Sequence, residues 1–465
     1  MLTRLGERFT RLFLRFMPDA FVFALVLTLI AGITAFFWMD TSPLKIISSW
    51  YDGFFDLLSF GMQIVLIIIT GFSIALSPTV NKGIDKLTRF IKTPKQVYFF
   101  VVMIGMLLCL VSFGWIVITC VLARELAKRV KGINYPFLVA CVYLSMNSWV
   151  LGLSSSIPLL LNTEKNYLIE AGILNNVIST SYTLGSLLNL SMIVFLVVIV
   201  PFVMLVLVPK NKDPKELSDL LDDKAHEEKL TIKEEANALK LPFKAVSDTL
   251  NNSVLLQIIV AIMGFAYIGH HFYTKGLDLN FNIMIFIFLM VGLLLHKSPM
   301  RYVISMKRSS SNVSGILFQY PFYAGIMGIM LYTGLGERLA QVLASVATVE
   351  TYPFFAYLSG AFVNFAIPSA GGEFAVIGPS IIEAVKEISM TAPDVDTQAM
   401  IARASLSIAY GESMSNMLQP FYLLLVMPIM AIGTKLQARD VMGYLFIPVI
   451  LFLVVQSLMV LFIPF

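Results

Sequence analysis

Apolar segments long enough to cross a lipid bilayer recur along the whole chain, and they constrain its fold more than any other feature. The chain has 465 residues, of which 58% are hydrophobic and only 13% are charged, whereas soluble domains carry about 25% charged residues. This excludes a soluble globular enzyme and predicts an all-α polytopic membrane protein. The uninterrupted segments are residues 20–38, 55–76, 185–208, 254–272, 281–295, 312–332 and 441–463.

Four other apolar segments are interrupted by Gly, Ser and Pro. Residues 97–121 are broken at Ser112-Phe113-Gly114, and residues 352–382 at Pro368 to Glu373. Their arms of about 14 residues are too short to cross, which predicts two re-entrant hairpins with tips at mid-membrane. Residues 136–161, broken near residues 154–158, and residues 399–427, broken near residues 412–420, are predicted to be unwound transmembrane helices.

The order of these elements repeats, so that each copy contains one hairpin and one broken helix. We expect about nine spanning helices plus two hairpins, with an odd number of crossings that inverts the second copy. The predicted domains are an interfacial amphipathic helix at 1–18, a first repeat at 19–209, a linker at 210–250, a connecting transmembrane helix at 251–273 and a second repeat at 274–465. The mixed charges of the linker favour a solvated cytoplasmic segment, and a regulatory docking role stays open.

The basic residues support this topology. With a cytoplasmic N-terminus, 27 of the 33 lysines and arginines fall on the cytoplasmic side, as the positive-inside rule requires. Hairpin one then enters from the cytoplasm and hairpin two from outside. The net charge of +4 is too small to indicate a nucleic-acid partner.

Enzymatic and metal-site signatures are missing from the sequence. It contains no His-Glu-x-x-His, P-loop or Gly-x-Ser-x-Gly motif, and its three cysteines fit no zinc or disulfide spacing. Metal binding by His270-His271 is disfavoured, because adjacent helical side chains diverge. We therefore expect no enzyme, no metal and no cofactor other than a coupling Na⁺ or H⁺.

Polar residues at membrane depth are the candidates for function, because ionisable side chains are costly there. The expected ion-coupling residues are Glu412, Glu373 and Gln419. A structural reading also exists, in which Glu412 caps a half-helix and Glu373 starts the second hairpin arm. Backbone amides at hairpin tips can bind a carboxylate, and close helix packing is the competing explanation for their small residues. The expected substrate-binding residues are Ser112, Gly114, Ser154, Ser155, Ser156, Ser369, Gly371, Gly372, Ser415 and Asn416.

At these residues the sequence resembles the bacterial short-chain fatty acid transporter family, of the acetoacetate and butyrate uptake type, within the larger ion-transporter fold group. The resemblance runs essentially from end to end. It implies a homodimeric secondary carrier of the inner (cytoplasmic) membrane, with scaffold and transport subdomains. The matching stretches are residues 17–19, 50–54, 60–63, 293–300, 319–326, 364–379 and 409–421.

We therefore expect a symporter of short-chain monocarboxylates that works by alternating access. Trp115, Trp149 and Phe374 are expected to enclose the apolar tail of the substrate. A dicarboxylate or amino-acid carrier of the same fold is the alternative. An intramembrane enzyme or sensor and a channel are less favoured, because no nucleophile and base pair lies at depth and inverted broken helices favour alternating access.

Overall fold

The computed structural model describes residues 20–464, apart from residues 57, 88–89, 164–165, 171, 210–213, 222–230, 244, 277–280, 311–312 and 392–394. The amphipathic helix predicted at residues 1–18 lies outside the described residues. The described chain is helical, and its one β feature is an isolated bridge between Leu221 and Thr434. Six of the described helical segments are long and apolar enough to cross a membrane. This confirms the predicted all-α membrane fold.

The predicted first repeat contains the elements from α2 to α12. Its elements are α2 (Ala20–Trp38), α3 (Pro43–Asp56), α4 (Leu58–Ala75), α5 (Pro78–Leu87), α6 (Pro94–Val111), η1 (Phe113–Trp115), α7 (Ile116–Arg129), α8 (Tyr135–Ser145), η2 (Met146–Leu151), α9 (Ser156–Leu161), α10 (Tyr167–Glu170), α11 (Leu187–Val194), η3 (Phe195–Ile199) and α12 (Val200–Leu207).

The predicted second repeat follows the linker, and its helices come in a similar order. The linker holds α13 (Leu217–Leu220), α14 (Ile232–Ala238) and α15 (Val246–Asn251), and α16 (Val254–Lys275) follows it. The copy itself consists of α17 (Phe281–His296), α18 (Pro299–Ser310), α19 (Ser314–Tyr332), α20 (Leu335–Ala344), α21 (Tyr352–Val363), α22 (Ala370–Met390), α23 (Thr397–Asn416), α24 (Leu423–Met430), α25 (Ala438–Met442), η5 (Gly443–Leu445) and α26 (Phe446–Phe462).

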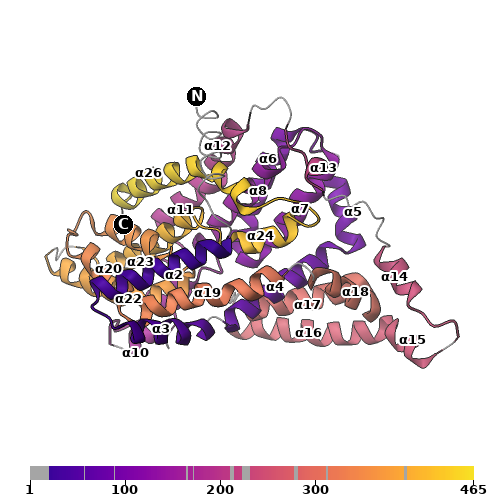
Figure 1. Ribbon diagram of the computed structural model, residues 1–465, viewed down its shortest axis with the longest axis horizontal. Helices are drawn as coiled ribbons and strands as arrows, with labels where there is room; N and C mark the ends of the chain where they lie inside the picture. Colours follow the sequence, from indigo (N-terminus) through magenta and orange to yellow (C-terminus); the bar gives the residue numbers. More distant parts are fainter. Residues whose placement is uncertain are drawn as a thin grey trace.

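The helices form two layers (Figure 1). In the scaffold layer, α19 packs against α2 and α3, and α4 packs against α17 and α18. In the hairpin layer, α6 packs against α8 and α12, and α21 packs against α23 and α26. The hairpins and broken helices thus share one layer, which meets the scaffold through contacts such as α4 with α7 and α20 with α22.

The two copies exchange contacts in a reciprocal way. The second arm of the first hairpin, α7, packs against α24 of the second broken helix. The second arm of the second hairpin, α22, packs against α9 of the first broken helix. Such an exchange is expected of two copies related by a pseudo-two-fold axis, while their opposite membrane orientation stays a prediction.

Both hairpins have one arm longer than predicted. Helix α6 has 18 residues because Thr93 and Gln96 form a capping box that starts it at Pro94. Helix α22 has 21 residues, since helix-forming residues around Lys386 continue it beyond the apolar segment. The expectation that every arm has about 14 residues or fewer was therefore wrong, and entry from opposite sides stays a prediction.

The breaks in the two transmembrane helices occur close to where they were predicted. The first lies between Leu151 and Ser156, and the second between Asn416 and Leu423. Glu412 is a correction, because it lies inside α23 rather than in the unwound segment. Pro420 explains this boundary: a proline clashes with the carbonyl four residues before it, and here that residue is Asn416.

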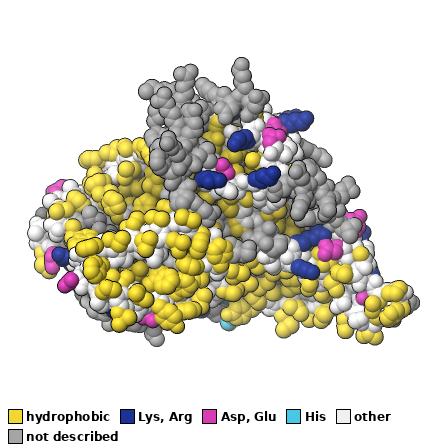
Figure 2. All heavy atoms as spheres, viewed as in Figure 1, with side chains coloured by type: hydrophobic (Ala, Val, Ile, Leu, Met, Phe, Trp, Pro, Cys, Tyr) yellow, Lys and Arg dark blue, Asp and Glu magenta, His cyan; other side chains and the backbone are white. Residues whose placement is uncertain are grey.

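The outer surface is apolar over the scaffold layer. Leu29, Ile33 and Phe37 of α2 are well exposed, with Phe37 exposed to 79%. Figure 2 shows a broad hydrophobic face over this layer with few charged side chains. A face of this kind suits contact with lipid.

Candidate functional site

The tip of the first hairpin contacts the break in the first broken helix. Ser112 ends α6 in an extended conformation and Phe113 follows in η1. The backbone N–H of Phe113 donates to Ser154 Oγ at 3.0 Å. The N–H of Leu153 donates to the carbonyl oxygen of Leu110 at 2.8 Å. The tip of the first hairpin and the first break are therefore joined by hydrogen bonds.

The tip of the second hairpin approaches the same break from the other copy. Ser369 precedes α22 without a side-chain cap, and its carbonyl accepts the Glu373 N–H at 2.7 Å. Gly371 is exposed, and a Cβ placed on it would first meet Ser156, at 4.0 Å. The N-terminus of α22 thus offers its first amides beside α9, where a carboxylate can be bound.

Asn364 at the end of α21 ties the second hairpin to the second broken helix. Its Nδ2 donates to Ser415 Oγ at 2.7 Å, to Asn416 Oδ1 at 2.8 Å and to the carbonyl oxygen of Glu412 at 3.1 Å. Gln419 Nε2 donates to Asn416 Oδ1 at 3.1 Å and to the carbonyl oxygen of Asn364 at 3.0 Å. These side chains stabilise the hairpin against the unwound segment.

The two broken helices are joined by further hydrogen bonds. Tyr143 OH donates to the carbonyl oxygen of Asn416 at 2.6 Å and lies 3.1 Å from that of Gln419. Ser413 Oγ lies 2.9 Å from the carbonyl oxygen of Asn147 and 2.8 Å from its Oδ1. The two halves of the site therefore form one buried polar network.

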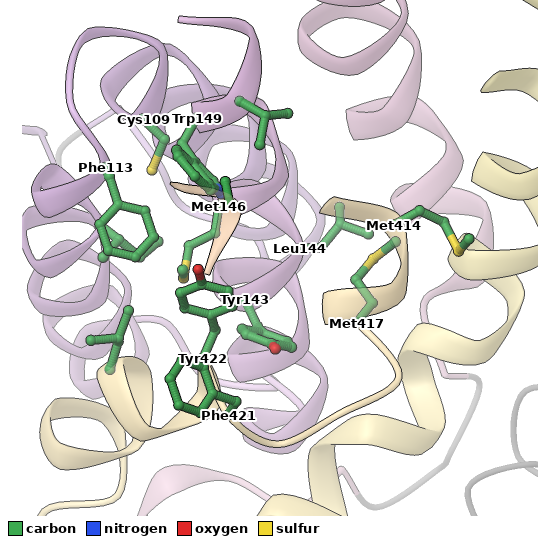
Figure 3. Packing of buried hydrophobic residues seen from close by; sticks show 14 of the residues in the cluster. Cys109, Phe113, Tyr143, Leu144, Met146, Trp149, Met414, Met417, Phe421 and Tyr422 are labelled. Carbon is green, nitrogen blue, oxygen red and sulfur yellow. The ribbon is translucent and has the colours of Figure 1, made fainter. Parts of the chain in front are cut away.

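Aromatic rings pack beside this network. The Phe113 ring lies 5.2 Å from Trp149 and 5.5 Å from Tyr422, so that the first hairpin tip contacts both broken helices. Figure 3 shows these rings with Tyr143 and Met146. Trp149 fits the predicted apolar wall, whereas Trp115 is half-buried in η1 and Phe374 is fully buried against Gly378 of its own helix.

Glu373 and Glu412 are the two fully buried acids in the described chain. No carboxyl oxygen of either has a hydrogen-bond partner among the described residues. The Asn416 amide, one turn along α23, interacts with Glu412 without forming a hydrogen bond of regular geometry. Glu373 lies close enough to Glu412 that the two carboxylates would repel each other when both are ionised.

The structure separates the predicted site residues into two groups. Ser112, Ser154, Ser155, Ser156, Ser369 and Gly371 lie at the hairpin tips and the first break. Ser415 Oγ, Asn416 Oδ1 and Gln419 Nε2 are used in internal hydrogen bonds that hold the second break. Gly114 faces Ile67 and Gly372 faces Met327, which indicates packing.

Three polar residues of the site were missed as candidates: Tyr143, Asn147 and Asn364. All three are buried within apolar segments. The signal that singled out Glu412, a polar side chain at membrane depth, applies equally to the two asparagines.

Within the described chain, no group of three or more His, Cys, Asp and Glu residues could hold a metal ion. The site instead combines helix-terminal amides, serine hydroxyls, an aromatic wall and two buried carboxyl groups. This set can bind one anionic group together with a short apolar tail.

Comparisons with known proteins agree along the whole chain. A profile of the short chain fatty acid transporter family matches residues 1–463. A relative from Escherichia coli (strain K12), named for short-chain fatty acid transport, is 35% identical over 447 residues and covers 96% of each chain. Another so named, from Haemophilus influenzae (strain ATCC 51907 / DSM 11121 / KW20 / Rd), is 32% identical over 450 residues, again 96% of each chain.

One solved structure also aligns along most of the chain. The YdaH transporter of Alcanivorax borkumensis, whose crystal structure is described as having an unusual topology, aligns over 97% of both chains with 14% identity and a TM-score of 0.41.

Proposed function

The chain belongs to the short-chain fatty acid transporter family, and on this premise we propose that it carries short-chain monocarboxylates such as butyrate or acetoacetate. Membership makes it a transporter and a multi-pass membrane protein, not an enzyme. We propose further that it is a homodimer in the bacterial inner membrane with a cytoplasmic N-terminus.

The observation that carries the substrate proposal is the charge of the site. Two hairpin tips and two helix breaks converge there, yet among the described residues no lysine, arginine or histidine interacts with Glu373 or Glu412. A dicarboxylate or an amino acid needs a second charge-matched contact, which the described residues of this junction do not supply. One carboxylate at the α22 N-terminus and a short tail against Trp149 fit better.

The mechanism proposed is alternating access by symport with protons or sodium ions. Its support is the division into a scaffold layer and a hairpin layer whose two copies exchange contacts reciprocally. Glu373 and Glu412 are the proposed ion-coupling groups, while Gln419 positions the second break through its amide.

The test is counterflow in proteoliposomes loaded with unlabelled butyrate. We expect labelled butyrate to enter faster than in protein-free liposomes, and external acetoacetate to compete with it. Succinate and amino acids should not compete. If succinate outcompeted butyrate, the dicarboxylate alternative would replace this proposal.

A further inference from the structure

The number of ions carried with each substrate follows from the charges buried in the site. Glu373 lies in the first turn of α22 and Glu412 near the end of α23, and both are fully buried. When both are ionised, they repel each other as like charges. The substrate proposed above adds the negative charge of its own carboxylate to this environment.

The described residues around the two glutamates supply too little positive charge to balance these groups. Tyr422 interacts with both glutamates, and Tyr143 and Tyr320 lie next to Tyr422; these tyrosine hydroxyls are neutral donors. The N-terminus of α22 contributes about half a positive charge. That partial charge can balance much of one carboxylate, but not three.

Two arginines of the hairpin layer, the buried Arg403 and the half-buried Arg124, form hydrogen bonds elsewhere. The Arg403 guanidinium donates to the carbonyl oxygens of Val460 and Ile463 at the end of α26. Arg124 donates to the carbonyl oxygens of Ile429 and Met430 at the end of α24 and of Ile432 just after it. Neither arginine is among the charged neighbours of the two glutamates.

We propose that Glu373 and Glu412 each take up one monovalent cation, a proton or a sodium ion, when the substrate binds. At least two positive charges then cross the membrane with each monocarboxylate. This inference rests on the proposed function, since it takes the substrate to be a monoanion bound in the same site. Burying an isolated charge in a medium of low polarity costs far more free energy than the gradients that drive transport provide, so each carboxylate must be neutralised.

The side-chain oxygen atoms of Asn364 and Gln419 can accept a hydrogen bond from a protonated carboxyl group or coordinate a sodium ion. The amide nitrogens of Asn364 and Gln419 are used in hydrogen bonds, whereas their side-chain oxygens have no donor among the described residues. A protonated carboxyl group would supply an O–H donor to such an oxygen. A sodium ion would instead take carboxylate and amide oxygens as ligands.

The ratio of cations to substrate is measured from the substrate gradient at which the net flux of butyrate stops. Proteoliposomes are given tenfold gradients of both protons and sodium ions, with the membrane potential clamped at zero and leakage through protein-free liposomes subtracted. Two cations per substrate hold a butyrate gradient of about a hundredfold, and one cation only about tenfold. Gradients of each ion alone then show whether protons, sodium ions or one of each are carried.

Variants assign the charges to the two glutamates. Glu373→Gln and Glu412→Gln should each reduce the gradient from about a hundredfold to about tenfold. Glu383→Gln, at an exposed position of the same helix as Glu373, is the control and should keep the full gradient. If both single variants lose counterflow, the gradient held by the wild-type protein alone tests whether two cations are carried with each substrate.

The outcomes separate this inference from the proposed function. Butyrate counterflow together with a gradient of about tenfold in the wild-type protein would overturn the inference while leaving the transport proposal intact. A full gradient in either Gln variant would overturn the assignment of that glutamate. Absence of butyrate counterflow in the wild-type protein would instead refute the proposed function.

Discussion

Replacing Gly411 with alanine should separate the second hairpin from the second broken helix. A Cβ on Gly411 would lie 1.9 Å from the carbonyl oxygen of Tyr357 and 2.8 Å from the backbone nitrogen of Ala361. Both atoms belong to the backbone of α21, so no side chain can move aside. The facing glycine is equally close, since a Cβ on Gly360 would lie 2.3 Å from the Ile408 carbonyl oxygen.

The expected cost follows from this geometry. The helices must move apart by about 1 Å to relieve the contact, and overpacking of a buried interface costs about 1–3 kcal/mol. The better helix propensity of alanine returns about 1 kcal/mol at most. The hydrogen bonds of Asn364 to Ser415 and Asn416 cross the same interface and would lengthen as well. We expect a net destabilisation of about 2 kcal/mol.

The assay is the midpoint of thermal unfolding of purified protein in detergent, followed by butyrate counterflow. Gly411→Ala should lower the midpoint and reduce counterflow, because Glu412 is the next residue. Gly269→Ala on the exposed side of α16 is the control, since a Cβ there meets nothing within 4 Å. A wild-type midpoint and wild-type counterflow for Gly411→Ala would refute the close approach of α21 and α23.

Two further predictions concern the polar network and the topology. Asn364→Ala removes a donor to three buried acceptors and should destabilise the protein by about 2 kcal/mol or more, measured as a lower midpoint of thermal unfolding. Asn162→Ala, at an exposed position, is the control and should leave the midpoint unchanged. An unchanged midpoint for Asn364→Ala would show that these hydrogen bonds are not formed. Single cysteines at Lys128 and Lys386, in a background without native cysteines, should react with an impermeant maleimide from opposite sides of the membrane, and reaction from the same side would disprove the inverted repeat.

The positions of the helices and their interruptions could be predicted from the sequence. Spans need long apolar segments, and Gly, Ser and Pro interrupt them for reasons that act within a few residues. Pro158 lies four residues after Ser154, which is in the first break, and Pro420 lies four residues after Asn416, the last residue of α23. Such local rules do not require knowledge of the fold.

The use of each polar atom could not be predicted, because it depends on which segments meet. Ser415 and Asn416 looked like ligand groups, but Asn364 reaches them from a helix some 50 positions earlier and uses their oxygen atoms. Gly114 and Gly372 likewise owe their packing roles to Ile67 and Met327. Contacts between distant segments are fixed by tertiary packing, which cannot be predicted from residue periodicity and motif spacing.

Substrate protection of a single cysteine at the second hairpin tip tests the central claim most directly, namely that this junction binds a monocarboxylate. Gly371 is exposed and has room for a side chain, with Ser156 as its nearest neighbour. In a background lacking Cys109, Cys120 and Cys141, Gly371→Cys should react with a maleimide more slowly when butyrate is present, and succinate should have no effect. Glu383→Cys on the same helix should react at the same rate in all conditions. Equal labelling of Gly371→Cys with and without saturating butyrate would contradict the account.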